Sequence, residues 1–127
     1  MTLTNMKRPI ERVAAFTVMA WLGEYIHNLY ELPQLALLSP ENSIPALVYL
    51  LLFMMWWLLP YRRITAILLI VWIALNLFVG AIITVIPFPF LPFYPEQSLQ
   101  HYLAHLLYGV AVLPLLSIMF RQWRHYE

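Results

Sequence analysis

The chain has 127 residues, of which 63% are hydrophobic and 10% charged, and its formal net charge is +1. Soluble domains carry about 25% charged residues, so this composition excludes an ordinary soluble domain and makes the lipid bilayer the expected partner. A nearly neutral chain without a basic stripe is not expected to bind nucleic acid. Cysteine is absent, which excludes disulfide bonds, thiolate metal ligands and cysteine catalysis.

Four segments each offer about 20 mostly apolar residues, the length that crosses a bilayer. We predict transmembrane helices at about 10–32, 40–59, 64–86 and 97–120. Pro9 suits the first turn of the first helix, while Ser39 and Glu41 supply an N-cap and a carboxylate at the start of the second. Prolines end the second and third helices: Pro60 and Pro87. The expected fold is all-α, with residues 1–127 forming a single integral membrane domain, an antiparallel up-and-down four-helix transmembrane bundle.

Proline alternates with aromatic residues between the third and fourth predicted spans, at 87–95. Because proline cannot continue a helix, we predict an extended, polyproline-like segment that lies in the membrane interface. Such a segment serves either as an interfacial anchor or as a lid over the polar residues of the neighbouring spans.

The basic residues predict the orientation of the chain in the membrane, because Lys and Arg stay on the cytoplasmic side. All seven fall in three places that four spans put on one side: Lys7, Arg8, Arg12, Arg62, Arg63, Arg121 and Arg124. The two connections on the other side contain Glu41 and Glu96 instead. We therefore expect both termini in the cytoplasm, and the cytoplasmic membrane of a bacterium or archaeon as the location.

Polar residues inside the predicted spans are the main functional signal. The first span carries four of them at positions i, i+3, i+4 and i+7, which is one helical face: Glu24, His27, Asn28 and Glu31. An ionisable group in the hydrocarbon region costs at least about 2.5 kcal/mol, so such groups usually face the interior of a bundle. Glu31 lies closest to the outer interface and is expected to be solvated.

Two other spans carry polar residues at matching depths: Asn76, His101, His105 and Tyr108. A helix rises about 1.5 Å per residue, so depth can be counted from the outer ends of the spans. On this count, antiparallel packing of the first and fourth spans brings Glu24 near His105 and His27 near His101. The sequence therefore predicts one shared polar site in the outer half of the bundle.

Several ligands suit this site. We predict ligand-binding residues Glu24, His27, Asn28, Asn76 and Tyr108, and a metal-binding set of His27, His101, His105 and Glu24. Glu-x-x-His and His-x-x-x-His are spacings that helical bundles use to bind transition metals. A b-type haem, held by His27 and either His101 or His105, is the other cofactor that the pattern allows.

The leading hypothesis is a small integral membrane protein that binds a metal, haem or small polar ligand at this site. A non-catalytic accessory subunit of a larger membrane complex is the alternative, with the polar cluster only clamping helices together. A second alternative is a small proton-coupled transporter that acts as a homo-oligomer and uses Glu24 and the histidines as a relay. No motif of a soluble enzyme is present, and the pattern leaves open whether the protein is an enzyme.

Overall fold

Helices make up most of the chain in the computed structural model, which describes residues 3–126 and the side chains of 9–126. The elements are α1 (Leu3–Glu31), α2 (Pro40–Leu58), α3 (Arg62–Leu75), η1 (Asn76–Ile82), η2 (Ile83–Val85) and α4 (Leu99–His125). The all-helical fold is thus confirmed for the described residues. Lys7 and Arg8, on which the predicted orientation partly depends, lie outside the described side chains, and residues 1, 2 and 127 lie outside the described chain.

Within residues 3–126, three helices are long and apolar enough to cross a membrane: Pro40–Leu58, Arg62–Val85 and Leu99–His125. They correspond to the second, third and fourth predicted spans. The first predicted span lies within α1, which is long enough but is not among the three, because its polar residues lower its apolar content.

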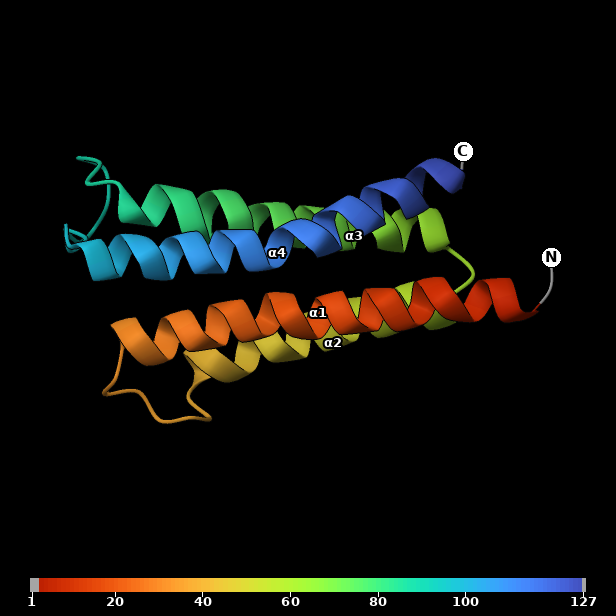
Figure 1. The fold of residues 1–127 in the computed structure, drawn as a ribbon, viewed down its shortest axis with the longest axis horizontal. Coiled ribbons are helices and arrows are strands. Elements are labelled where there is room, and N and C mark those ends of the chain that lie inside the picture. Colours follow the sequence, from red (N-terminus) through yellow and green to blue (C-terminus); the bar gives the residue numbers. More distant parts are fainter. Residues whose placement is uncertain (1–2, 127) are drawn as a thin grey trace.

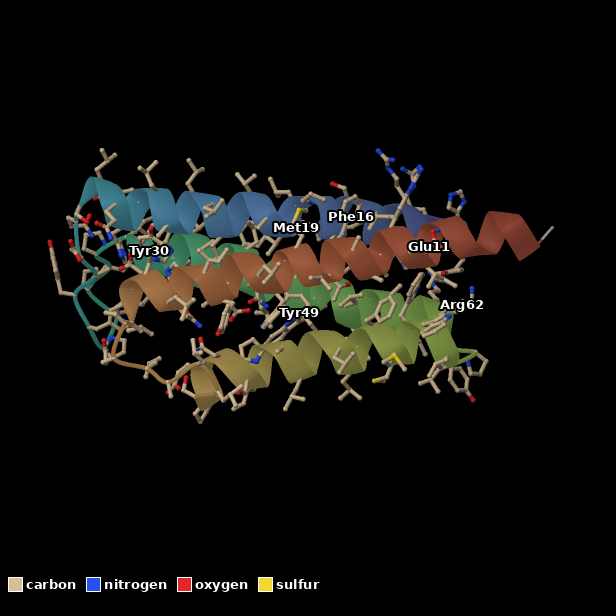
Figure 2. The ribbon with its side chains drawn as sticks, turned by 60° about the horizontal axis from the view of Figure 1, so that its bottom comes forward. Glu11, Phe16, Met19, Tyr30, Tyr49 and Arg62 are labelled. Atoms are coloured by element: carbon tan, nitrogen blue, oxygen red, sulfur yellow. The ribbon has the colours of Figure 1, made fainter. Side chains whose placement is uncertain are left out.

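The four helices run side by side along one long axis (Figure 1). Both α1 and α3 pack against α2 and against α4. The two chain ends lie at the same end of the molecule, which we call the basic end, and Figure 2 places Arg62 there. Tyr30 lies toward the opposite end, the loop end, where residues 32–39 and 86–98 connect the helices (Figures 1 and 2).

The predicted helix starts are partly correct. Helix α2 begins at Pro40 with Ser39 at the N-cap position, although the Ser39 hydroxyl makes no capping hydrogen bond. Helix α4 begins at Leu99, two residues later than predicted, because the Ser98 hydroxyl accepts a hydrogen bond from the backbone N–H of His101 at 3.2 Å. The predicted place of Pro9 in the first turn is wrong, since α1 begins at Leu3 and contains Pro9, which forfeits one backbone hydrogen bond without ending the helix.

The third helix changes its winding toward the loop end. After Leu75 it continues as a π-helix over Asn76–Ile82 and then as a short 3-10 helix over Ile83–Val85. Short π-helical segments inside longer helices are frequent at functional sites, because the altered winding redirects carbonyl groups. This segment is the part of the third helix that faces the polar residues of α4.

The connection 86–98 is not extended over its whole length, so that prediction is wrong. The backbone N–H of Leu91 donates to the carbonyl of Phe88 at 3.2 Å, which closes a turn, and the rings of Phe88 and Phe90 stack with centroids 5.0 Å apart. Stacking of the two aromatic rings stabilises this turn. A regular polyproline helix has no internal hydrogen bonds and would not contain such a turn.

The buried side chains differ in polarity between the two ends of the molecule. The side chains with no exposed surface lie between the middle of the helices and the basic end: Val13, Ala20, Ala66, Leu69, Ile73, Val112, Leu115 and Met119. Two buried threonines in this region, Thr17 and Thr65, donate to carbonyl oxygens within four residues of their own positions. The packing here is therefore apolar, and the other buried polar side chains lie toward the loop end.

Large apolar side chains also cover the outer surface. On α2 alone, Leu47, Leu51 and Leu58 are each at least 60% exposed. A soluble monomer rarely exposes such continuous apolar surface, whereas a bilayer covers it.

Candidate functional site

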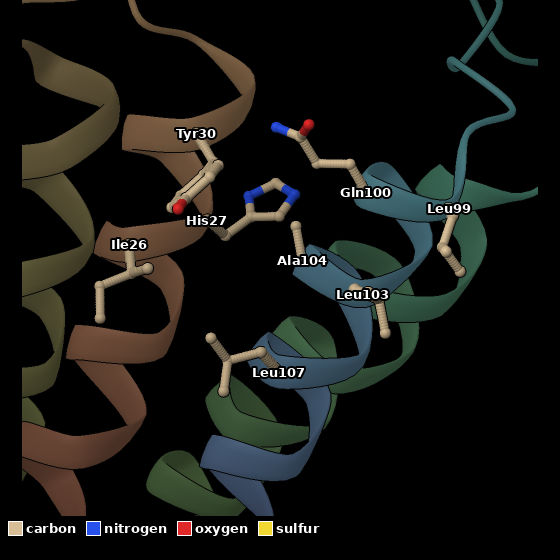
Figure 3. A pocket seen from close by; sticks show the side chains of 8 residues that line it. All are labelled: Ile26, His27, Tyr30, Leu99, Gln100, Leu103, Ala104 and Leu107. Carbon is tan, nitrogen blue, oxygen red and sulfur yellow. The ribbon is translucent and has the colours of Figure 1, made fainter.

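The contact between α1 and α4 contains most of the predicted site residues. A cavity of about 580 Å³ runs along this contact near the loop end (Figure 3). His27 lies on the wall of the cavity and points from α1 toward Gln100 and Ala104 of α4 (Figure 3). His101 and His105 of α4 are buried inside the protein.

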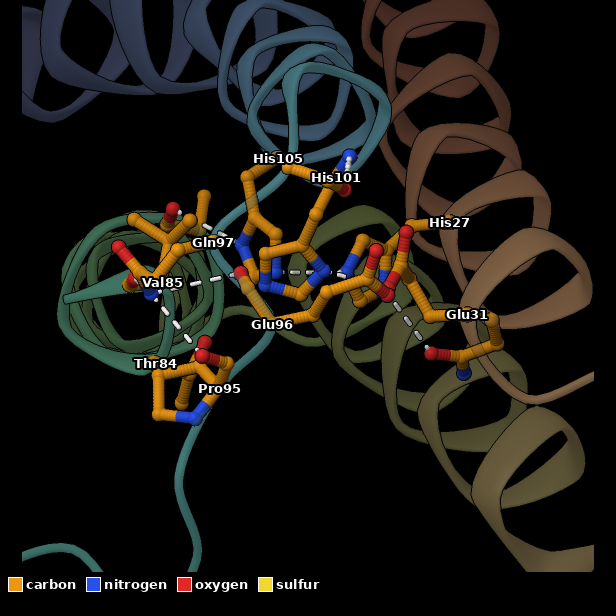
Figure 4. Close-up of polar contacts among 12 residues, drawn as sticks. His27, Glu31, Thr84, Val85, Pro95, Glu96, Gln97, His101 and His105 are labelled. Carbon is orange, nitrogen blue, oxygen red and sulfur yellow. Dashed lines mark hydrogen bonds and ion pairs between the residues drawn. The ribbon is translucent and has the colours of Figure 1, made fainter. Parts of the chain in front are cut away.

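Three histidines and one glutamate form a connected group that we call the histidine cluster: His27, Glu31, His101 and His105 (Figure 4). The Nε2 atoms of His27 and His105 are 3.0 Å apart, and their rings meet edge to face with centroids 4.3 Å apart. The ring of His101 lies 4.5 Å from that of His105, and its Nδ1 atom pairs with a carboxylate oxygen of Glu31. The cluster therefore links α1 and α4 at two contacts about one helical turn apart.

The pairing of α1 with α4 differs from the prediction by about one helical turn. His105 pairs with His27 rather than with Glu24, and His101 pairs with Glu31 rather than with His27. The expectation that Glu31 is solvated is also wrong, because its side chain is only 15% exposed. Helix α4 begins two residues later than predicted, which accounts for about 3 Å of the displacement in pairing.

Asn28 determines which ring nitrogen of His27 carries a hydrogen. The side-chain N–H₂ of Asn28 donates to the carbonyl of Glu41 and to Oδ1 of Asn42, both at 3.2 Å. These two acceptors fix the orientation of the amide, so its Oδ1 faces Nδ1 of His27 at 3.2 Å and can only accept. Nδ1 of His27 is therefore a donor.

His105 is constrained in the same way from α3. Its Nδ1 atom lies 3.0 Å from the carbonyl oxygen of Ala81, in the π-helical segment, and a carbonyl can only accept. Nδ1 of His105 is therefore also a donor, and the two Nε2 atoms of His27 and His105 face each other. The three contacts of the pair are His27 Nδ1 to Asn28, His105 Nδ1 to Ala81, and Nε2 to Nε2. As hydrogen bonds they need three N–H hydrogens, but two neutral imidazoles carry only two. One additional proton, shared between the two Nε2 atoms, would supply the third hydrogen.

A second polar layer lies deeper along the same helices. The hydroxyl of Tyr108 donates to Oδ1 of Asn76, whose N–H₂ donates to the carbonyl of Trp72 at 2.8 Å. The Tyr108 ring is 5.4 Å from that of His27, which joins this layer to the histidine cluster. Gly80 makes room for the tyrosine, because a Cβ at this position would lie 2.8 Å from the Tyr108 hydroxyl.

Glu24 belongs to this deeper layer and not to the histidine cluster. Its carboxylate lies close enough to Tyr49 and Tyr108 to interact electrostatically with both. Its Oε2 atom and the Tyr49 hydroxyl are buried without a hydrogen-bond partner among the described residues. Each of these groups can therefore still accept or donate a hydrogen bond.

The structure gives no support to either predicted cofactor, a transition metal or a b-type haem. Within the described part of the chain, no three His, Asp or Glu side chains are arranged to hold a metal ion, so the metal prediction gains no support. A haem between His27 and His105 does not fit. The two nitrogens would have to face one iron from opposite sides of a porphyrin, and rings in edge-to-face contact leave no space for that plane.

The sequence interpretation omitted three groups that the structure adds to the site: Glu31, Asn42 and the Ala81 carbonyl. Glu31 had a usable signal, because it continues the helical face of Glu24, His27 and Asn28. The other two had none, since they depend on the connection 32–39 and on a change of helix winding. Comparisons with protein-family models, with curated proteins and with solved structures found no match.

Proposed function

We propose that this protein is a four-span integral membrane protein, with both termini in the cytoplasm, that takes up a proton at the His27–His105 pair in the outer half of its bundle. The observation that carries the proposal is the hydrogen count: both Nδ1 atoms face acceptors, and the two Nε2 atoms face each other at 3.0 Å. A proton fits this space, whereas a metal ion would need further ligands.

The surroundings of the pair support proton uptake from the loop end. The Glu31–His101 pair lies between the loop end and His105, and carboxylates and histidines are the groups that form proton relays in membranes. Beyond Tyr108, the packing toward the basic end is apolar. A path for protons therefore extends from the loop end to the middle of the helices and stops there.

Proton-coupled transporters are the class of membrane protein that uses such a site. Four helices alone make a narrow translocation path, so transport by this chain would require an oligomer. The Glu/His/Asn site would then couple the proton to a small polar ligand that contacts Glu24 and Tyr49, whose buried oxygens are unpartnered.

The test is histidine ¹⁵N nuclear magnetic resonance of the protein in detergent as the pH is lowered. We expect His27 and His105 to take up one proton between them in a single shared step. Asn28→Leu removes the acceptor that forces Nδ1 of His27 to donate, so the pair no longer needs a third hydrogen and the shared step should disappear. Independent titration of His27 and His105 in the unmodified protein would show that the proposal is wrong.

The proposed topology gives a separate expectation, which the absence of cysteine makes simple to check. Single cysteines at Glu41 and Glu96 should react with a membrane-impermeant maleimide added outside intact cells. Cysteines at Tyr61 and Arg124 should react only after the membrane is opened. Reaction of the cysteines at Tyr61 and Arg124 from outside, with those at Glu41 and Glu96 protected, would contradict the proposed orientation.

A further inference from the structure

We propose that the groove between α1 and α4 binds an uncharged amphiphile of the quinone class, with its carbonyl head near Tyr30 and Gln100. This site is separate from the shared proton of the His27–His105 pair, although the His27 ring lies on its wall. The proposal rests on the size of the groove, the chemistry of its two ends and the distribution of charge around it.

The groove has the size and lining of a small-molecule site. Its volume of about 580 Å³ lies within the usual range of about 300–1,000 Å³ for ligand pockets. Leu99 and Leu107 mark its two ends on α4, and eight residues of helix span about 12 Å. Away from the loop end it is lined by apolar side chains, those of Ile26, Leu103 and Leu107, which suit a hydrocarbon tail.

The loop end of the groove carries hydrogen-bond donors instead. Tyr30 and Gln100 lie on either side of the His27 ring (Figure 3), and neither makes a hydrogen bond within the described chain. A phenol O–H and an amide N–H₂ can both donate to a carbonyl oxygen, and the His27 ring offers a flat surface beside them. These features suit a planar head that bears carbonyl groups.

The charge distribution argues against an acidic head. Among the described side chains, the Lys and Arg residues fall in segments near the basic end, so none of them lies at the groove to pair with a phosphate or a carboxylate. The charged residues near the loop end are carboxylates: Glu31, Glu41 and Glu96. Phospholipids with anionic heads and fatty acids would therefore bind less well than a neutral molecule.

The experiment is a thermal-unfolding titration of the detergent-purified protein with decyl-benzoquinone. A ligand that binds only the folded state raises the melting temperature in a saturable way. We expect a rise of a few degrees that Ala104→Phe, which fills the groove, abolishes. Gln100→Leu removes one donor and should weaken the apparent affinity about 2- to 10-fold. Leu106→Phe is the matched control, because Leu106 lies on α4 but faces the α3 side, and it should leave the titration unchanged.

Other results would overturn the proposal. An equal rise with decanoate or decanol would show that the groove only accepts an alkyl chain. No effect of Ala104→Phe on the quinone response would place binding elsewhere. A dimer that Ala104→Phe dissociates, without any response to quinone, would assign the groove to a second copy of the chain. Loss of the shared proton step in Asn28→Leu leaves all these outcomes unaffected, so the two proposals fail separately.

Discussion

Replacing Gly23 by alanine should destabilise the protein by about 1–3 kcal/mol, the usual range for inserting a methyl group into tight packing. A Cβ at this position would lie 2.5 Å from the Cβ of Ala111 on α4, which is closer than real Cβ atoms approach. Small residues allow such close contact of helix backbones in membranes, and this contact holds α1 against α4 beside the histidine cluster. Equilibrium unfolding in mixed detergent micelles measures the free energy.

A compensating variant makes this expectation specific. Ala111→Gly removes the methyl group that the new alanine would meet, and the next atoms, in Tyr108, are 3.7 Å away at ordinary contact distance. The cost of Gly23→Ala should therefore fall close to zero in the Ala111→Gly background. Gly109→Ala is the control, because its new Cβ would have no neighbour closer than 3.5 Å. An undiminished cost in the double variant would mean that helix separation is not the cause.

Replacing His101 by alanine should cost about 3 kcal/mol of unfolding free energy, since it leaves the Glu31 carboxylate largely buried without its partner. Glu31→Gln in the same protein removes the uncompensated charge and should recover part of this loss. The coupling between the two positions, measured by a double-mutant cycle, should reach about 1–3 kcal/mol. Thermal or detergent unfolding of the four proteins provides the measurement.

Glu96→Gln is the matched control for this cycle, because Glu96 is an exposed carboxylate at the same end of the protein. It should change stability by less than about 0.5 kcal/mol. Equal losses for His101→Ala with and without Glu31→Gln would show that the two side chains do not interact, and that the histidine contributes only by packing.

The local sequence accounts for most of the fold. Apolar runs of span length bounded by prolines predicted the helices, and Pro40, Pro60 and Pro87 lie at or next to the observed boundaries. The π-helical segment after Leu75 and the turn at 88–91 could not be predicted in this way. The π-helical segment packs against α4, and the turn is held by a hydrogen bond and a ring stack within its own segment, neither of which periodicity describes.

For the site, the sequence predicted the histidine face of α4 correctly but not its alignment with α1. The spacing of His101 and His105 put both on one face of α4, and both contact α1, whereas His27 faces α4 and Asn28 bonds to the start of α2. Alignment between antiparallel helices depends on where each connection ends, and an error of two residues there moves every pair by about 3 Å along the axis. Functional roles of these residues stay predictions.

The closed packing beyond Tyr108 has an electrical consequence. In the proposed function, a proton that enters from the loop end would meet mostly apolar packing toward the basic end, where the buried hydroxyls of Thr17 and Thr65 donate to carbonyls of their own helices, so it would leave by the way it came. From Glu31 to His27 is four residues, or about 6 Å, which is about one fifth of a 30 Å hydrocarbon core. One charge crossing the whole membrane gains or loses about 2.3 kcal/mol per 100 mV, so the share felt at the histidine pair is about 0.5 kcal/mol. Under the proposed function, proton occupancy of the pair would thus change about twofold for each 100 mV, so proton binding would respond to membrane voltage as well as to pH.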